Sequence, residues 1–326
     1  MYPIKFKPIL KEKVWGGKRL LDIKKGSLSH ADTSKDYGES WDLSGLEGNV
    51  SVAANGFLKG NNLQEIIEVY MGDLVGEAVF DRYGLDFPLL VKTIDCHDRL
   101  SVQVHPNDDI AAERHGKCGK SEMWYVVDAA PDAAIYIGFK DRNITREQYI
   151  DAVAKGNVAD IIQPVKVKAG DVFYIPAGTV HTMTQGVSVI EIQQPVDLTY
   201  RIFDWNRVDD KGRSRELHTA WAVDAIDFES TAESCRRNYT AETNKATEVV
   251  NCDYFTANII KLSGTAERDY CKLDSFVIYV CADGKAEIDD GESLTPITAG
   301  ETVLIPAETG DVTLKGEATI LECYIA

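Results

Sequence analysis

The sequence predicts a mainly β protein made of two related β-domains, with a few helices inserted in the N-terminal half. The strongest observation is an internal repeat: the nine residues from Ala169 to Ala177 recur from Ala299 to Ala307, with five of the nine positions identical. Each copy has a glycine turn, an apolar strand and a terminal proline. In addition, helical periodicity occurs only before residue 156, whereas strand-like patterns fill most of the remaining chain.

Length and charge limit the possible functions. A chain of 326 residues has room for two domains with separate cores. The sequence becomes polar and loosely patterned around residues 222–251, which places the boundary near residues 225–245, and we take the domains as residues 1–235 and 236–326. The net charge of -17 would repel nucleic acids and anionic membranes, so neither is an expected partner. A small anionic substrate stays possible where a few basic residues converge locally.

The cellular compartment is suggested by what the chain lacks. The N-terminal segment Met1–Pro8 has no long apolar run, and no later run is long enough to span a membrane. The seven cysteines are scattered and form no C-x-x-C pair, so we expect reduced thiols that serve mainly as packing residues. Both observations predict a cytoplasmic protein.

The first elements alternate between short strands and one helix. Phe6–Trp15 and Tyr37–Ser44 have the alternation of strands, and Gly16-Gly17 is expected to form a turn. The helix Asn62–Tyr70 is predicted from an asparagine cap and from apolar residues that recur on one helical face. Phe87–Asp95 is expected to be a buried strand.

The stretch Ser101–Asp108 predicts a strand with one polar face. Ser101, Gln103 and His105 alternate with two valines, so they share a face that can point into a cavity. The alternative is a strand with one solvated face. Past Pro106 the residues Asp108–His115 favour a short helix, because acidic residues open it and Gly116 follows it.

A strand and a helix are expected next. Lys120–Val127 is rich in aromatic and β-branched residues, which favours a strand. Thr145 and Gln148 have the spacing of a capping box, so we expect a helix that runs to about Lys155 and stops at Gly156. Strands should follow it to the end of the chain.

The two copies of the repeat differ where chemistry is expected. His181 follows the first copy by four residues, whereas Asp311 follows the second, and Glu122 aligns with Phe276. Together with the polar strand face described above, these residues give one set of candidate metal ligands in the first domain and none in the second. Two imidazoles, a carboxylate and an amide oxygen suit a divalent cation such as zinc. The alternative is that these side chains are unrelated polar residues. The four candidate metal ligands are Gln103, His105, Glu122 and His181.

Several motifs in order resemble those of the type I mannose-6-phosphate isomerases, in the short bacterial form, over about residues 3–215. These are Gly38–Trp41, Ser101–Asp108, Lys120–Trp124, Ile175–His181 and Arg201. The resemblance implies a cupin (β-jelly-roll) fold. Together with the repeat, it predicts two cupin-type domains, of which the second lacks metal ligands. It also implies a zinc-dependent interconversion of mannose 6-phosphate and fructose 6-phosphate, with one divalent ion per chain.

Carried over residue by residue, the resemblance assigns the four candidate ligands to the metal and Arg201 to the active site. Ser101, Lys120 and Glu191 are candidates for substrate binding, and Glu191 is also expected to be a buried acid or base with a raised pKa. Met183 replaces an aromatic residue of longer members, which puts a substrate contact there in doubt.

Each assignment has a structural alternative. Arg201 can lie on a solvated strand face, Lys120 can be a surface lysine, and Glu191 can pair structurally with an arginine. The basic residues that follow Arg201 can attract phosphate or form a solvated loop. They are Arg207, Lys211, Arg213 and Arg215.

The chemistry agrees with an aldose-ketose isomerase that acts on a small phosphorylated sugar. Removal of the C2 proton gives a cis-enediol, and the charge that develops on oxygen needs a fixed cation. Arg201 can supply a permanent charge beside it. The rival functions are a cupin oxygenase with iron at the same ligands and a non-catalytic cupin that binds sugar or regulates. The sequence predicts no oligomeric state.

Overall fold

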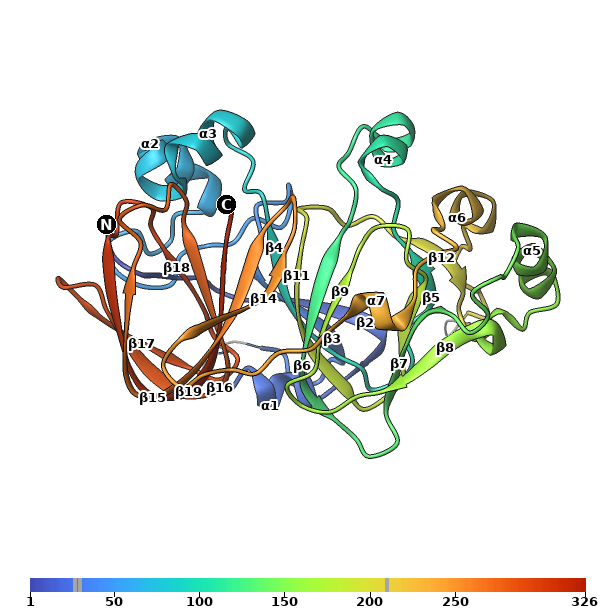
Figure 1. Ribbon diagram of the computed structural model, residues 1–326. Helices are drawn as coiled ribbons and strands as arrows, with labels where there is room; N and C mark the ends of the chain where they lie inside the picture. The colour runs from blue at the N-terminus through green and yellow to red at the C-terminus, as the bar shows by residue number, and fades with distance from the viewer. Residues whose placement is uncertain (26–27, 29–30, 209–210) are drawn as a thin grey trace.

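The computed structural model describes residues 1–25, 28, 31–208 and 211–326. Strands make up most of the regular structure and assemble into three sheets. Two sheets enclose an N-terminal barrel, and the third coils around a separate core at the C-terminal end, so that two barrels lie side by side (Figure 1). The prediction of a mainly β fold is confirmed.

The N-terminal barrel is built from a seven-stranded and a five-stranded sheet, with antiparallel pairing throughout. The larger sheet has the order β13-β9-β6-β11-β4-β3-β2, formed by Arg236–Arg237, Val172–Ile175, Glu122–Ala129, Val187–Gln193, Leu90–Asp95, Tyr37–Leu43 and Ile9–Gly17. The smaller sheet has the order β12-β5-β10-β7-β8, formed by Tyr200–Phe203, Val102–Val104, His181–Met183, Ala134–Phe139 and Ile162–Lys166. Side chains alternate across each strand, so every second residue faces the barrel interior.

The C-terminal barrel is one seven-stranded antiparallel sheet. Its order is β1-β18-β16-β19-β15-β14, formed by Ile4–Lys5, Thr302–Ile305, Val277–Asp289, Asp311–Tyr324, Thr256–Asp269 and Ala246–Asn251, and β17 (Leu294–Thr298) pairs with β16. The barrels therefore exchange short strands: β1 comes from the N-terminus, and β13 lies beyond residue 235 yet pairs in the N-terminal barrel. The domain boundary itself stays a prediction.

The helices lie at the ends and sides of the barrels (Figure 1). They are α1 (Arg19–Ile23), α2 (Leu63–Val75), α3 (Glu77–Tyr83), α4 (Asp108–His115), α5 (Arg146–Ala154), the short 3-10 helix η1 (Val158–Ile161), α6 (Thr219–Ala225) and α7 (Ala232–Cys235). Capping boxes begin α2 at Asn62 and α5 at Thr145, and Gly116 ends α4 in the left-handed region. The three predicted helices are confirmed, although α2 continues to Val75 and α1, α3, α6 and α7 were not predicted. No helix among the described residues is long and apolar enough to cross a membrane.

Two local predictions are corrected. Gly16-Gly17 does not form a turn but ends β2. Glycine is needed there for close packing, because a Cβ on Gly16 would lie 2.5 Å from the backbone carbon of Tyr37. The residue aligned with Glu122 is also shifted by one: Glu122 pairs with Ile175, and in the second copy Val277, not Phe276, pairs with Ile305. All seven cysteines fall within the described ranges and are unpaired, as expected.

Candidate active site

Three of the four candidate metal ligands converge inside the N-terminal barrel. His105 follows β5, Glu122 opens β6 and His181 opens β10, so three strands from both sheets contribute one side chain each. Their nearest ligand atoms lie within 4.8 Å of one another, and all three residues are buried. The Nε2 atoms of His105 and His181 lie 3.5 and 3.4 Å from the two carboxylate oxygens of Glu122.

Backbone carbonyls orient both imidazoles. Nδ1 of His105 lies 2.9 Å from the carbonyl of Leu198, and Nδ1 of His181 lies 2.9 Å from the carbonyl of Thr179. Each ring therefore donates from Nδ1 and turns the lone pair of Nε2 toward the centre, which is the arrangement of a metal-binding histidine. Burial lowers the pKa of both imidazoles, that of His181 to about 4, so the rings are neutral at pH 7.

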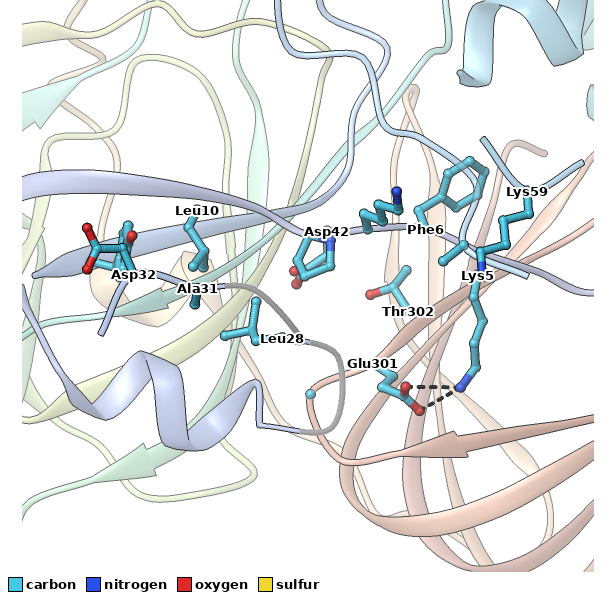
Figure 2. A pocket seen from close by; sticks show the side chains of 15 residues that line it. Lys5, Phe6, Leu10, Leu28, Ala31, Asp32, Asp42, Lys59, Glu301 and Thr302 are labelled. Carbon is cyan, nitrogen blue, oxygen red and sulfur yellow. Dashed lines mark hydrogen bonds and ion pairs between the residues drawn. The ribbon is translucent and has the colours of Figure 1, made fainter. Parts of the chain in front are cut away.

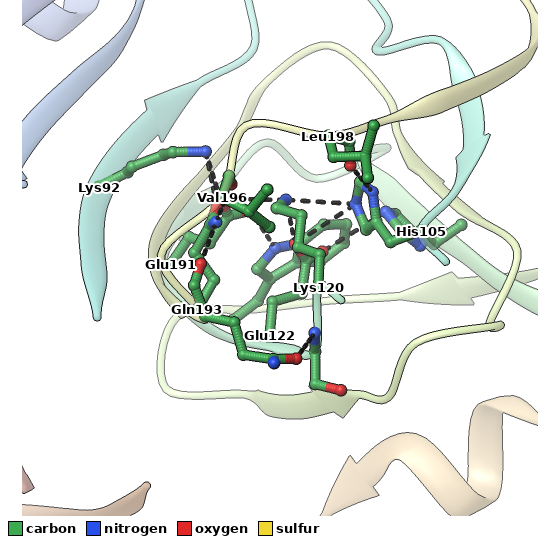
Figure 3. Close-up of polar contacts among 12 residues, drawn as sticks. Lys92, His105, Lys120, Glu122, Glu191, Gln193, Val196 and Leu198 are labelled. Carbon is green, nitrogen blue, oxygen red and sulfur yellow. Dashed lines mark hydrogen bonds and ion pairs between the residues drawn. The ribbon is translucent and has the colours of Figure 1, made fainter. Parts of the chain in front are cut away.

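The donor set is incomplete without a cation. Oε1 of Glu122 and Nε2 of His181 are buried without a hydrogen-bond partner. The ammonium of Lys120 bonds to the other oxygen of Glu122 and lies 3.2 Å from Nε2 of His105 (Figure 3). Burial and the charge of Glu191 raise the pKa of Glu122 to about 7 in spite of Lys120. Since unpartnered buried polar atoms are costly, two imidazoles and a carboxylate here fit a divalent cation.

The position of Gln103 is compatible with the fourth ligand. It lies in the middle of β5, opposite His181 on β10 and opposite Arg201 on β12. Its side chain is half-buried and lines the same cavity as Arg201. The ligand role of Gln103 stays a prediction.

A second charged cluster adjoins the donor set. The carboxylate of Glu191 on β11 accepts from Lys92 at 3.0 Å and from the indole of Trp124 at 2.8 Å, and it lies 3.6 Å from Lys120 (Figure 3). Burial alone would raise its pKa, but the charges of Lys120 and Lys92 lower it to about 2. The expected raised pKa of Glu191 is therefore wrong, because the positive charges of Lys92 on β4 and of Lys120, which precedes β6, stabilise the ionised carboxylate.

A polar cavity of 290 Å³ lies beside the donor set and is linked to it by Lys120, which lines the cavity and contacts both Glu122 and His105. The residues that line it are Lys13, Trp15, Glu39, Lys92, Ile94, Leu100, Ser101, Gln103, Lys120, Glu191, Asp197, Thr199, Arg201 and Arg215. All the candidate substrate-binding residues and Arg201 thus share one cavity, and of the basic residues that follow Arg201 only Arg215 lines it. Met183 is buried in the hydrophobic core instead.

Sequence reasoning missed Lys92, Glu39 and Asp197 among the cavity residues. A signal for Lys92 was present, because a charged residue interrupts the apolar strand 87–95. All six residues of β4 are buried, so this lysine had to find a carboxylate inside the barrel.

The segment 216–218 binds both the backbone and the guanidinium of Arg201. Its backbone N–H donates to Nδ1 of His218 at 3.1 Å, and its Nη1 donates to the carbonyl of Glu216 at 2.8 Å. Burial and the charge of Arg215 lower the pKa of Arg201, although the group stays far from neutral at pH 7. Asp204 binds the guanidinium groups of Arg207 and Arg215, which keeps Arg215 beside Arg201 at the cavity.

A larger cavity of 680 Å³ lies elsewhere, where the N-terminal segment meets the C-terminal barrel (Figure 2). There Lys5 pairs with Glu301 at 2.9 Å and joins β1 to the loop before β18. None of the residues proposed for the site lines this cavity.

The same arrangement of motifs occurs in proteins of known family. The family model for the type I phosphomannose isomerase catalytic domain matches residues 4–137, and that for the mannose-6-phosphate isomerase cupin domain matches residues 245–325. Mannose-6-phosphate isomerase ManA of Bacillus subtilis is 35% identical over 99% of this chain and 98% of its own length. The chain belongs to the type I phosphomannose isomerase family. A mannose-6-phosphate isomerase of Streptococcus mutans is 30% identical over 99% of this chain and 98% of its own.

Solved structures agree with this family. The crystal structure of the mannose 6-phosphate isomerase from Bacillus subtilis superposes with a TM-score of 0.84 at 31% identity and covers 99% of both chains. A variant of the phosphomannose isomerase from Salmonella typhimurium superposes with a TM-score of 0.79 over 100% of both chains, at 16% identity. This second likeness shows the fold alone.

Proposed function

We propose that this chain is a zinc-dependent mannose-6-phosphate isomerase that forms fructose 6-phosphate, and the reverse, through a cis-enediol. The observation that carries the proposal is a buried donor set with unpartnered atoms, which Lys120 links to a neighbouring cavity with three lysines and two arginines in its wall. The cations suit a phosphorylated sugar, and the donors suit one divalent ion. Membership of the type I family supports both the reaction and the substrate.

The metal site is assigned to Gln103, His105, Glu122 and His181, in the domain 1–235. When bound, zinc would supply the fixed positive charge that stabilises the oxygen anion of the enediol. The domain 236–326 is assigned no catalytic ligand. We also propose that the protein is cytoplasmic, in line with its unpaired cysteines, and that it binds neither nucleic acid nor membrane.

The remaining residues bind and orient the sugar. Arg201 is the catalytic arginine, because its permanent charge lies in the cavity wall with Arg215 beside it. Ser101 and Lys120 can hydrogen-bond sugar oxygens, since both line the cavity near the donor set. Glu191 stays ionised and fixes Lys120 and Lys92, so its low pKa favours a role in orienting the two ammonium groups over one in proton abstraction.

A coupled isomerase assay on mannose 6-phosphate tests the proposal. Activity should disappear after treatment with EDTA and return when zinc is added, and metal analysis should find one ion per chain that is absent from the His105→Ala variant. Turnover that is indifferent to metal would overturn the mechanism. Iron-dependent oxygen consumption in place of isomerisation would favour the oxygenase, and binding of sugar without turnover would favour a regulatory cupin.

A further inference from the structure

One hydroxyl of the C-terminal barrel reaches the segment that follows His105. Tyr254 lies in the connection between β14 and β15, and its Oη donates to Oδ2 of Asp108 at 2.6 Å. Asp108 is the first residue of α4 and follows His105 by only three positions. The contact therefore joins the barrel without assigned ligands to the segment that supplies a proposed ligand.

Asp108 passes this contact to two further segments. Its Oδ1 accepts the backbone N–H of Gly119 at 2.7 Å and the side-chain amide of Gln194 at 3.0 Å. The other side-chain atom of Gln194, Oε1, accepts the backbone N–H of Ser121 at 2.7 Å. The backbone N–H of Gln194 also donates to the carbonyl of Ser121 at 3.2 Å.

These bonds bracket the residues of the site. Gly119 and Ser121 flank Lys120, and Ser121 precedes Glu122, so both backbone N–H groups lie in the segment that positions a proposed ligand and a substrate-binding lysine. Gln194 lies just past the end of β11, the strand that contains Glu191. A single carboxylate thus fixes the segments on either side of the charged cluster.

One side of this network faces a second cavity. Tyr254, Asp108 and Gln194 line a cavity of 660 Å³ whose wall also includes Asp197, and Asp197 lines the active-site cavity as well. Because Ser121 and Gln194 are buried, the hydrogen bonds between them help to hold the backbone of this segment rigid. Burial raises the pKa of Asp108, but the bonds from Tyr254, Gly119 and Gln194 outweigh it and keep the carboxylate ionised.

We propose that Tyr254 is a positioning residue, through which the C-terminal barrel holds the Lys120–Glu122 segment in the geometry required for metal and substrate. This gives the second barrel a role in the active site without any ligand of its own. The inference rests on the proposed function for its kinetic consequence. Its structural consequence, the rigidity of residues 119–121, does not depend on that function.

The test compares Tyr254→Phe with Tyr239→Phe. Tyr239 also comes from the region beyond residue 235 and donates from its hydroxyl to the N-terminal barrel, at 2.7 Å from the carbonyl of Gly170, at the far end of β9 from the site. Both variants remove one half-buried phenolic hydroxyl and keep the ring. Any general weakening of the contact between barrels should therefore appear in both, whereas a positioning role should appear only at Tyr254.

Three measurements separate these roles. We expect Tyr254→Phe to lower kcat about tenfold with little change in KM, and to speed the loss of zinc to EDTA by a similar factor, whereas Tyr239→Phe changes neither. In the metal-free protein, amide hydrogen exchange at Gly119 and Ser121 should accelerate in Tyr254→Phe alone. Asp108→Asn should resemble Tyr254→Phe, and the double variant should be no worse than Asp108→Asn.

Equal behaviour of the two tyrosine variants in all three measurements would overturn the proposal and leave Tyr254 a structural contact. If the wild-type protein fails to isomerise mannose 6-phosphate, the proposed function falls. Amide exchange and zinc loss still decide the role of Tyr254 in that case.

Discussion

Each of the two barrels has a buried glutamate at the corresponding position of its sheet. In the N-terminal barrel Glu191 pairs across the sheet with Lys92 on one side and Trp124 on the other. In the C-terminal barrel Glu322 pairs in the same way with Asn258 and Tyr279. The strand register supports this correspondence. Lys92 and Asn258 are separated by the same number of residues as Gln103 and Asp269. Gln103 pairs with His181, and Asp269 pairs with Asp311.

Glu191 and Glu322 are each bonded through both carboxylate oxygens, so what differs is the set of buried polar groups beside the carboxylate. Both oxygens of Glu322 are bonded, with Arg268 at 2.8 and 3.0 Å and with the amide of Asn258 at 2.7 Å. The N-terminal barrel leaves Glu122 and His181 each with a buried atom that has no partner. A buried polar cluster that closes on itself stabilises a fold, whereas one that leaves donors converging on a point requires a ligand.

The positions that correspond to the proposed metal ligands have also diverged in exposure. The register aligns Gln103, His105 and His181 with Asp269, Cys271 and Asp311. Those three side chains lie close together but are exposed, and the position of Glu122 is taken by the buried Val277. Without a carboxylate at the position of Glu122, the described residues of the second barrel form no enclosed donor set at this end.

The largest expected difference is between Glu122→Gln and Glu322→Gln. Glu122→Gln should lower isomerase activity by about a hundredfold to a thousandfold and remove bound metal, because the amide lacks the charge that the site requires. Glu322→Gln should leave activity within about twofold but lower the free energy of unfolding by about 3 kcal/mol, because Arg268 loses its buried partner. Steady-state kinetics and denaturant unfolding of the metal-free proteins measure both effects.

The unfolding data also test the comparison in the opposite direction. Glu122→Gln should destabilise the metal-free protein less than Glu322→Gln does, because one oxygen of Glu122 has no partner and Lys120 keeps Glu191 nearby at 3.6 Å. If Glu122→Gln lowers the free energy of unfolding as much as Glu322→Gln does, then the N-terminal cluster is also structural and the distinction drawn here is wrong.

A smaller effect is expected from Lys92→Met. This variant removes the positive charge at a position that Asn258 occupies in the second barrel. Lys92 and Lys120 hold the pKa of Glu191 at about 2, below its ordinary value of 4.5, against the effect of burial. With one lysine gone the pKa should rise, so the acid limb of kcat/KM should move to higher pH at saturating zinc. The stability that ionised Glu191 contributes is present above its unfolded pKa and is lost as pH falls through the folded pKa, so it too should be lost at higher pH in the variant.

Lys92→Arg is the matched control, because it keeps the charge. It should keep the acid limb near that of the wild type, with some loss of kcat from the bulkier group in a buried strand. An acid limb that stays unchanged in Lys92→Met would show that Lys92 does not set the ionisation of Glu191.

Much of the fold and part of the site follow from local sequence. The capping residues Asn62 and Thr145 fixed two helix starts, and the repeat located β9 and β18, because these features act over a few residues. The gathering of His105, Glu122 and His181 was also predicted, but only through the difference between the two repeat copies and the family motifs. The exact partner of each residue depends on register, which is why the aligned residue was misplaced from Val277 to Phe276.

Long-range electrostatics and contacts between the barrels were beyond sequence reasoning. The pKa of Glu191 is set by Lys92, 99 positions away in the chain, and no local pattern reveals that pair. The bond from Tyr254 to Asp108 spans 146 positions and joins a loop to the start of α4. Neither segment has a periodicity that would indicate its neighbour, so only the folded arrangement reveals the contact.

The smallest expected effect comes from the exposed side chains of the second barrel. The double variant Cys271→Ser, Asp311→Ala should change isomerase activity less than about twofold and the free energy of unfolding by about 0.5 kcal/mol or less, because exposed side chains without a buried partner contribute little. Metal analysis should find one ion per chain in both proteins. Two ions in the wild type and one in the variant would instead show that register-equivalent positions bind metal in both barrels, and that burial of the donor set is not what separates them.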